Sequence, residues 1–359
     1  MNGGTVMEHI GAIIGFGGMA MHHFKQLENY GRCRFKGVYD IDPKRGAAAE
    51  REGLKAYGSK EALLSDGDVE FVLIAATNEV HKELSVEALR AGKHVICEKP
   101  ATISSAELEE ITEVSKECGR LFTIDQNRRT NPDFLMMKRH VENGDIGSVY
   151  VIESRVEGSR GMPAGWRTIK ALGGGMMLDW GVHLIDQLLY MVNGSVTSVY
   201  CRMFNIQYPE VDDNFRLTML FDTGLTAHIE VSTNNYITHP RWYVLGSRGT
   251  MQIDDWDCNG KIVRSTEKED VWEEEIVYTK AGPTKTMAPR SKNSTETIIL
   301  SDESKEPYSD MVPVYDQFAD AIEGIAPLKI TAEQAMRVMK VMEAAFKSHE
   351  TRTAVLCNI

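Results

Sequence analysis

The segment Gly15-Phe16-Gly17-Gly18-Met19-Ala20 follows an apolar run at residues 9–14 and opens a helical pattern. It fits G-x-G-x-x-G/A, with Ala20 in the last position. In this pattern the first glycine permits a tight turn, and the second lets the backbone approach a pyrophosphate at the helix N-terminus. An ordinary glycine turn of an α/β domain is the alternative. The apolar run before the turn and the helix after it favour a dinucleotide site made by these six residues.

An acidic residue stands where such a site needs one. Asp40 ends the next apolar run, residues 34–39, twenty residues beyond the glycine turn. A carboxylate there can hold both ribose hydroxyls, and it would repel a 2′-phosphate. We therefore predict that Asp40, with its neighbour Ile41, binds NAD in preference to NADP. Lys44 and Arg45 follow closely and could favour the phosphate instead.

Residues 1–125 alternate short apolar runs with helical patterns. Strands are expected at 9–14, 34–39, 71–76, 94–97 and 121–124, and helices at 47–52, 80–91 and 106–118. Because strands that alternate with helices at this spacing pair in parallel, we predict a doubly wound parallel sheet in an α/β domain.

Residues 126–359 alternate apolar and polar side chains, as in half-buried strands. The clearest pair, 215–221 and 225–231, is joined by the hairpin signal Asp222-Thr223-Gly224. We predict a second α/β domain with a largely antiparallel sheet, one face of it solvated or forming an interface. Further strands are expected at 148–156, 198–204, 242–245 and 353–359, helices at 314–322 and 332–349, and an irregular polar excursion at 280–310. The helix at 332–349 is expected to pack back on the first domain.

Length and composition exclude several classes of protein. A chain of 359 residues suits two domains. Its net charge of -12 argues against nucleic acid or an anionic membrane as a partner. No apolar stretch of about 18 residues is present, and the N-terminus lacks a secretion-signal pattern. The six cysteines form no Cys-x-x-Cys pair, which favours a reduced, cytoplasmic protein.

A second chemical signal is the stretch 172–186, Leu-Gly-Gly-Gly-Met-Met-Leu-Asp-Trp-Gly-Val-His-Leu-Ile-Asp. Three glycines clear side chains from a turn, and a helical run then carries Asp179, His183 and Asp186. Spacings of four and three place these polar groups on one helix face. Histidine is the side chain that moves a proton near neutral pH. A plain hydrogen-bonded pair in a helix is the alternative, but the glycines favour a catalytic site with Asp179 and His183.

Polar residues also follow two expected strands of the first sheet, at the carboxyl ends where ligands bind in such sheets. The strand 94–97 leads into Glu98-Lys99-Pro100, where the proline restrains Lys99 to extended backbone. A surface salt bridge is the alternative for Lys99. His81 could contact the cofactor or substrate, or cap a helix. The residues that we assign to cofactor binding at these ends are Ala76, Thr77, Asn78, His81, Glu98 and Lys99.

Substrate contacts are predicted for Asn127, Arg128, Trp166 and Arg167, together with Asp179 and His183. Arginines after the strand 121–124 could orient a polyhydroxy substrate or pair with acids between domains, and we favour the structural role for Arg129. Trp166 could stack on a sugar face or serve in a core. No metal site is predicted, because the adjacent His22 and His23 point to different helix faces.

In this order, the motifs resemble the glucose–fructose oxidoreductase / inositol dehydrogenase / MocA (Gfo/Idh/MocA) family over nearly the whole chain. The anchors are Gly15-x-Gly17-x-x-Ala20, Asp40, Asn78-x-x-His81, Ala91-Gly92-Lys93-His94-Val95, Glu98-Lys99-Pro100, Arg128-Arg129, Gly144-Asp145-Ile146-Gly147, Gly174-Gly175, Asp179-x-x-x-His183 and Gly246-Ser247-Arg248-Gly249-Thr250. The resemblance implies an N-terminal Rossmann domain and a C-terminal α/β domain with an open, mostly antiparallel sheet. That sheet commonly forms the oligomer interface, so a homodimer or homotetramer is expected.

The resemblance also implies NAD(P)-dependent oxidation or reduction of a CH–OH group in a sugar, cyclitol or related alcohol. Lys99, Asp179 and His183 take the family's catalytic positions. Two segments depart from the family's pattern: Asp125-Gln126-Asn127 stands where many members have a glycine and an aromatic residue, and Thr130-Asn131-Pro132 where an aromatic residue is usual. Both border the expected substrate pocket, so the substrate of known members is not carried over.

The combined interpretation is an NAD-dependent dehydrogenase that oxidises a secondary hydroxyl of a sugar, cyclitol, polyol or glycoside. His183 would accept the hydroxyl proton, Lys99 would hydrogen-bond the same oxygen, and Asp179 would hold the protonation and geometry of the site. The roles of Lys99 and His183 could be exchanged. Two alternatives stay open: an NAD-recycling glycosidase that acts by transient oxidation and elimination, and a non-catalytic NAD-binding sensor.

Overall fold

The computed structural model describes residues 7–266, 276–284, 292–301 and 311–359. Its first sheet has six parallel strands in the order β3-β2-β1-β4-β5-β6. The strands are β1 (His9–Ile14), β2 (Cys33–Tyr39), β3 (Lys55–Ala56), β4 (Phe71–Ile74), β5 (His94–Cys97) and β6 (Phe122–Ile124). The connecting helices are α1 (Gly18–Gln26), α2 (Pro43–Arg51), α3 (Lys60–Leu64), α4 (His81–Arg90) and α5 (Ser105–Cys118).

The order of these strands fixes where a ligand can bind. The chain runs outward from β1 to β3 and then returns to the other side of β1 as β4. In open α/β sheets the crevice at such a reversal lies outside the carboxyl ends of the strands. All four residues of β4 are buried, as expected for a strand covered on both faces. The predicted doubly wound sheet is confirmed, and its ligand crevice lies at the ends of β1 and β4.

The second sheet has nine strands in the order β16-β13-β12-β11-β7-β10-β9-β8-β17. Only β7 and β10 are parallel neighbours, and the other neighbours are antiparallel, so the predicted largely antiparallel sheet is also confirmed. Its strands are β7 (Val149–Glu157), β8 (Val196–Phe204), β9 (Asn214–Phe221), β10 (Thr226–Ser232), β11 (Trp242–Gly246), β12 (Gly249–Ile253), β13 (Gly260–Ser265), β16 (Thr295–Leu300) and β17 (Val355–Leu356). A separate hairpin pairs β14 (Val277–Thr279) with β15 (Gly282–Thr284).

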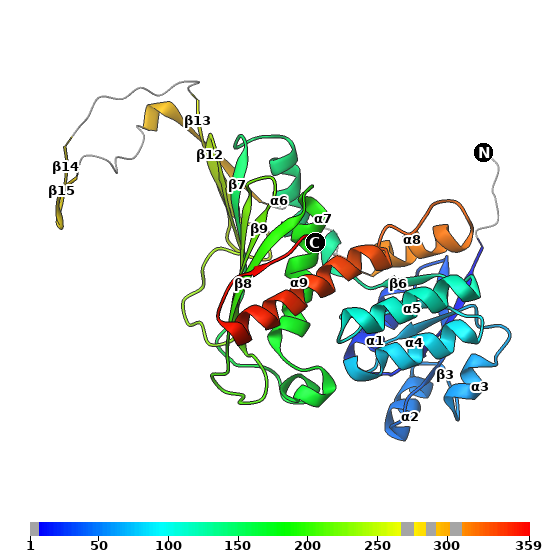
Figure 1. Ribbon diagram of the computed structural model, residues 1–359. Coiled ribbons are helices and arrows are strands. Elements are labelled where there is room, and N and C mark those ends of the chain that lie inside the picture. Colours follow the sequence, from blue (N-terminus) through cyan, green and yellow to red (C-terminus); the bar gives the residue numbers. More distant parts are fainter. Residues whose placement is uncertain (1–6, 267–275, 285–291, 302–310) are drawn as a thin grey trace, which may run out of the picture.

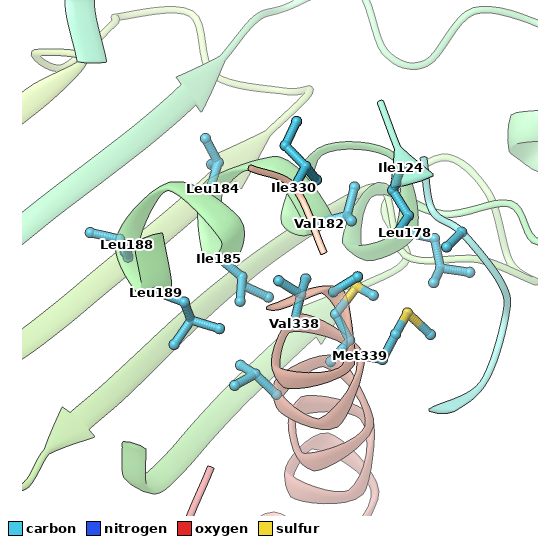
Figure 2. Packing of buried hydrophobic residues seen from close by; sticks show 14 of the residues in the cluster. Ile124, Leu178, Val182, Leu184, Ile185, Leu188, Leu189, Ile330, Val338 and Met339 are labelled. Atoms are coloured by element: carbon cyan, nitrogen blue, oxygen red, sulfur yellow. The ribbon is translucent and has the colours of Figure 1, made fainter. Parts of the chain in front are cut away.

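One face of this sheet is apolar and covered by helices. The buried side chains alternate along β9 and β10, with Leu217 opposite Ile229 in the register. Three helices pack on the sheet: α6 (Pro132–Glu142) against β12, α7 (Val182–Met191) against β10, and α9 (Ala332–Thr351) against β8. Figure 2 shows α7 and α9 meeting through Ile185, Leu189 and Val338. This packing anchors the helix that carries His183 between the sheet and α9.

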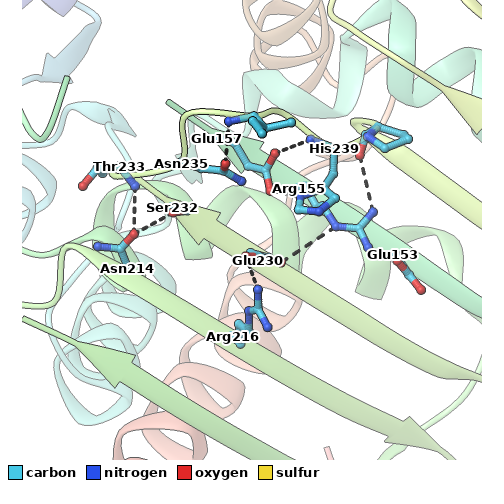
Figure 3. Close-up of polar contacts among 12 residues, drawn as sticks. Glu153, Arg155, Glu157, Asn214, Arg216, Glu230, Ser232, Thr233, Asn235 and His239 are labelled. Carbon is cyan, nitrogen blue, oxygen red and sulfur yellow. Dashed lines mark hydrogen bonds and ion pairs between the residues drawn. The ribbon is translucent and has the colours of Figure 1, made fainter. Parts of the chain in front are cut away.

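The opposite face of the sheet is polar. Glu230 on β10 accepts a hydrogen bond from Arg216 Nη2 on β9 at 2.8 Å. It also lies 3.9 Å from Arg155 Nε on β7, and Arg155 forms a second ion pair with Glu153 (Figure 3). Such cross-strand pairs stabilise a solvated face weakly. The predicted alternation of in and out positions therefore holds across the middle of the sheet.

The end of the chain returns to the first domain. Helix α8 (Val312–Ile322) places Tyr315 and Phe318 in the core of the first sheet, with the Phe318 ring 5.6 Å from that of Phe71. Helix α9 packs on α5 and β6 as well as on α7 and β8. The two sheets are therefore joined by a helical layer that contacts both (Figure 1).

Two expectations need correction. The stretch 280–310 is not irregular throughout, because Thr295–Leu300 forms the edge strand β16, and residues 285–291 and 302–310 lie outside the described residues. The closing strand expected at 353–359 is assigned only at Val355–Leu356, although backbone hydrogen bonds to the start of β8 continue to Ile359. None of the described helices is long and apolar enough to cross a membrane.

Candidate functional site

A cleft of about 780 Å³ opens at the carboxyl ends of β1, β2, β4 and β5. Two residues of the second domain, Trp166 and Arg167, also line it. The predicted cofactor residues that line the cleft are Gly15, Gly17, Gly18, Met19, Asp40, Ile41, Ala76, Thr77, Asn78, His81, Glu98 and Lys99. The remaining two, Phe16 and Ala20, have side chains buried in the core beneath the turn. The cleft thus gathers segments that are far apart in sequence at one edge of the sheet.

The glycine turn has the shape that a dinucleotide needs. Gly15 has φ +88, and a Cβ there would lie 2.7 Å from the backbone nitrogen of Ala76, so only glycine fits. A Cβ at Gly18 would meet nothing within 4 Å, and one at Gly17 would meet only the Arg45 side chain, at 3.7 Å. Backbone N–H groups at the start of α1 are therefore open to a ligand, and the residues present fit a bound dinucleotide.

Asp40 is held in place by the turn it faces. Its Oδ2 accepts from the Phe16 backbone N–H at 2.7 Å, and its Oδ1 accepts from the Asp42 N–H at 2.8 Å. Arg45 Nη1 lies 3.4 Å from the same carboxylate. The predicted competition between Asp40 and a nearby arginine is therefore present as a contact in the structure.

The residues after β4 brace the cleft. His81 Nδ1 lies 2.9 Å from the Pro100 carbonyl and Nε2 lies 3.1 Å from the Ala76 carbonyl, so the ring ties the end of β4 to the loop after β5. Asn78 donates to the Gly173 carbonyl at 2.8 Å and so joins the first domain to the glycine run of the second. His81 begins α4 without making a cap hydrogen bond.

Lys99 and Asp179 meet across the two domains. Lys99 Nζ donates to the Asp179 backbone carbonyl at 2.8 Å and to Oδ1 at 2.9 Å. Arg167 Nε donates to Oδ2 of the same carboxylate at 2.8 Å. Burial alone would raise the pKa of Asp179, but the charges and hydrogen bonds of Lys99 and Arg167 outweigh it and hold that pKa below its usual value. The carboxylate is therefore a fixed anion that positions the lysine.

His183 is buried one helical turn after Asp179, with 4% of its surface exposed. Its Nδ1 has no hydrogen-bond partner among the described residues. Burial, with the charges of Lys99, Arg128 and Arg241, lowers the pKa of His183 well below its usual value. The ring is therefore neutral at physiological pH and can accept a proton.

The helix that carries these residues begins in an unusual way. Met177–Gly181 is a π-helical turn, and α7 continues from Val182. Asp212, which sequence reasoning missed, caps this start: its Oδ2 accepts from the Met177 N–H at 2.7 Å. A Cβ on Gly175 would lie 2.3 Å from Asp212 Oδ1, so the last glycine of the run makes room for the cap. A carboxylate distant in sequence thus sets the start of the helical segment that carries Asp179 and His183.

Asp186 lies three residues after His183 on the same regular helix, and its buried carboxylate is ion-paired. Its two carboxylate oxygens accept from Arg129 Nε at 2.7 Å and Nη2 at 2.6 Å. Arg129 therefore has the structural role that its sequence position favoured.

A cluster of tryptophans and arginines lies beside His183. The Trp180 ring is 5.9 Å from the His183 ring and 5.1 Å from Arg128 Cζ. Trp256, from the β12–β13 connection, lies 5.8 Å from Arg128 Cζ and 4.6 Å from Arg241 Cζ. Of these, only Arg128 was predicted from sequence as a contact residue. Its predicted neighbour Asn127 is buried, and the Asn127 backbone carbonyl accepts from the Thr130 hydroxyl at 2.6 Å.

A buried trio of His23, Glu98 and Asp125 places possible ligand atoms within 4.8 Å of one another. His23 Nε2 lies 2.9 Å from Glu98 and Nδ1 lies 2.9 Å from the Tyr315 hydroxyl. Burial would lower the pKa of His23, but hydrogen bonds to Asp125 and Glu98 outweigh it and raise that pKa to about 10. In this structure the ring is ion-paired with both carboxylates, so the trio braces α1 against the ends of β5 and β6.

Comparisons with known proteins agree with this architecture. Residues 11–126 match a family described as "Oxidoreductase family, NAD-binding Rossmann fold", and residues 134–252 match the "GFO/IDH/MocA C-terminal domain". The crystal structure of an NAD-binding protein from Listeria innocua is 42% identical and superposes with a TM-score of 0.92, covering 98% of this chain and 100% of that one.

Two curated relatives are more distant. An uncharacterized oxidoreductase of Schizosaccharomyces pombe is 28% identical, over 96% of this chain and 98% of its own length. The scyllo-inositol 2-dehydrogenase (NADP(+)) IolW of Bacillus subtilis is 28% identical, over 82% of this chain and 81% of its own length. With a matching nucleotide-binding first domain and a matching second domain, this chain belongs to the Gfo/Idh/MocA family of NAD-binding oxidoreductases.

Proposed function

We propose that the protein is an NAD-dependent dehydrogenase that oxidises a secondary hydroxyl of a sugar, cyclitol, polyol or glycoside. The observation that carries this proposal is the contact of Lys99 with Asp179, with a neutral His183 one turn away. All three lie where the nucleotide cleft meets the second domain. Bound NAD supplies a nicotinamide carbon that accepts a hydride from the substrate carbon.

Lys99 has one donor left for the substrate. An ammonium carries three N–H groups, and two of them go to the backbone carbonyl and Oδ1 of Asp179. The third can bind the reacting oxygen and stabilise the negative charge that develops there. Asp179, held by Arg167 from its other side, fixes the direction of that donor. Lys99 is thus aimed before the substrate arrives.

His183 is suited to take the hydroxyl proton. A general base has to be unprotonated at working pH, and the pKa of His183 is lowered by burial and by three nearby cations. Its Nδ1 has no partner among the described residues, so that nitrogen is open to a substrate hydroxyl. The hydroxyl proton would pass to His183 as the hydride leaves.

The experiment is a panel of sugars, inositols, polyols and glycosides, scored by NADH absorbance with NAD and NADP side by side. A dehydrogenase forms stoichiometric NADH with at least one compound. Release of sugar from a glycoside without NADH, with exchange of the substrate C–H in deuterated water, would show the recycling glycosidase instead. Tight NAD binding with neither reaction would contradict the proposed activity.

An assembly of two or four copies is also proposed. On the polar face of the second sheet, Tyr200 and Leu220 are 40% and 42% exposed, and they lie on the paired strands β8 and β9. Apolar side chains on an open sheet face support a contact between copies. Light scattering at micromolar concentration would give the mass, and a monomer would contradict this part of the proposal.

A further inference from the structure

Arg128 differs from the other arginines around the site. Arg167 is bound by Asp179, Arg129 by Asp186, and Arg241 Nε lies 3.3 Å from Asp133. In the described part of the chain, the buried Nε of Arg128 and that of Arg241 both lack a hydrogen-bond acceptor, but Arg241 has the carboxylate of Asp133 beside it and Arg128 has no acidic partner. The tryptophan rings described above are its side-chain neighbours. A half-buried guanidinium with unsatisfied N–H groups is costly unless a ligand or water satisfies them.

The contacts of Arg128 hold it without using its donors. Its Cζ lies 5.1 Å from the Trp180 ring and 5.8 Å from the Trp256 ring. These distances place the guanidinium beside both rings, and its buried Nε has no hydrogen-bond acceptor in the described chain. The Arg128 backbone carbonyl accepts from Gln187 Nε2 at 2.7 Å. The residue is therefore fixed in position with its donors unfilled.

The same contacts place Arg128 beside the reacting centre. Gln187 lies four residues after His183 on α7, so both are on one side of that helix. Trp180 touches the His183 ring as well as the guanidinium. A substrate whose hydroxyl meets His183 can therefore reach Arg128 with another group a few bonds away.

The charge balance favours a negative group there. Around His183, the cations Lys99, Arg167 and Arg241 share two acids, Asp179 and Asp133. Arg128 adds a further positive charge with no acid beside it in the described chain. A carboxylate matches the planar fork of a guanidinium with two parallel hydrogen bonds.

We propose that the substrate is a polyhydroxy acid and that Arg128 binds its carboxylate while His183 and Lys99 act on a hydroxyl. This inference rests on the proposed dehydrogenase function and narrows its substrate class from sugars and polyols in general to compounds with a carboxylate. Trp180 and Trp256 are positioning residues, since they act by holding Arg128.

The test uses pairs of compounds that differ only in one terminal group. The pairs are D-gluconate with sorbitol, D-galactonate with galactitol, and D-mannonate with mannitol. Each compound is titrated by calorimetry into the full-length protein saturated with NADH, because the reduced cofactor cannot accept a hydride and the titration then measures binding alone. We expect at least one acid to bind about tenfold more tightly than its neutral partner, as a charge-assisted hydrogen bond predicts. If no acid outbinds its neutral partner, the inference is wrong.

Variants then assign the preference to Arg128. R128Q should bring acid and polyol affinities within about twofold of each other, and R128K should keep part of the gap because a lysine retains the charge but not the fork. The matched control is R216Q, which removes an exposed arginine from β9 and should keep the whole gap. If R128Q keeps the full difference between acid and polyol affinity, Arg128 does not bind the carboxylate. If R128Q does not fold, the same full difference in R128K would lead to that conclusion.

Turnover separates the two proposals. Acid binding that depends on Arg128, without NADH formation, would leave this inference standing and remove the dehydrogenase. If neutral polyols are oxidised with the same kcat/KM as their acids, the dehydrogenase proposal stands and the inference of a carboxylate substrate is wrong. Preferred oxidation of an acid, lost selectively in R128Q, supports both.

Discussion

The nucleotide cleft and the tryptophan–arginine cluster are adjacent but built by different means. The cleft is lined mostly by residues that directly follow the strands β1, β2, β4 and β5 of one sheet. The cluster is made by long side chains from the end of β6, the start of α7 and the β12–β13 connection. A residue that directly follows a strand is brought to the sheet edge by that strand. The residues of the cluster come together only when segments distant in sequence pack against one another. The cleft can therefore serve many relatives, and the cluster can distinguish among substrates.

The largest expected effect comes where the two regions meet. K99M removes the donor that reaches both Asp179 and the substrate oxygen, so kcat should fall by about 10³-fold. NAD affinity should change only a few-fold, because the remaining cleft residues are intact. Both quantities are measured with the best substrate of the panel, by NADH absorbance and by NAD titration. Near-normal turnover would remove Lys99 from the mechanism.

A second substitution tests whether the cleft depends on backbone shape. G15A would place a Cβ at 2.7 Å from the Ala76 nitrogen at a positive φ, and should weaken NAD binding roughly a hundredfold. The matched control is G53A, which has φ +86 but nothing within 4 Å of its Cβ. It should lose only about 1 kcal/mol of stability and keep NAD affinity. Equal NAD affinities in the two variants would show that the close contact at Gly15 is unimportant.

Asp40 provides a smaller test of the same region. The unmodified protein should prefer NAD over NADP by about tenfold, since like charges at close range disfavour a 2′-phosphate. D40S should shrink or reverse this preference, because Arg45, now 3.4 Å from Asp40, would be freed to bind the phosphate. R45Q is the companion variant and should retain the preference for NAD. If the unmodified protein binds both cofactors equally, Arg45 already dominates and the interpretation of Asp40 is wrong.

The smallest effect concerns pH and couples the cluster to catalysis. Because burial and three cations lower the pKa of His183, the acid limb of kcat/KM should lie below pH 6.5. R128Q removes one of these cations and should move that limb to higher pH. On the stability side, unfolded His183 binds a proton near pH 6.5 and the folded form resists it, so its contribution to stability is lost as pH falls below that value. An acid limb at or above pH 6.5 would argue against His183 as the base.

The cleft could be predicted from sequence because its signals are local. A glycine pattern after a strand, an acid after the next strand and a Glu-Lys-Pro run each place their own residues at the sheet edge. The alternation along β9 and β10 predicted their buried faces for the same reason. Local signals failed where a partner came from elsewhere. Nothing near Asp186 reveals that Arg129 binds it, and Asp212 caps a helix that starts 35 residues before it.

The tryptophan–arginine cluster also could not be predicted from local sequence signals. Trp256 is 44% exposed in a connection rich in aspartate, and no spacing rule relates it to Arg128. Its role depends on sheet topology, which brings the β12–β13 connection over the start of α7. The strand β16 was missed because its pairing with β13 crosses a long polar stretch.

Helix α8 has a consequence for how the protein is made. Met311, Tyr315, Phe318 and Ala319 complete a core whose other members lie between residues 13 and 96. At about 5–20 residues per second, synthesis of residues 97–310 takes on the order of 10–40 s. During that time the chain is still attached to the ribosome and α8 has not been made, so the aromatic side chains around Phe35 and Phe71 stay uncovered. The newly made first domain is therefore a natural client for a chaperone, and its protease resistance should rise only after residue 322 has left the exit tunnel.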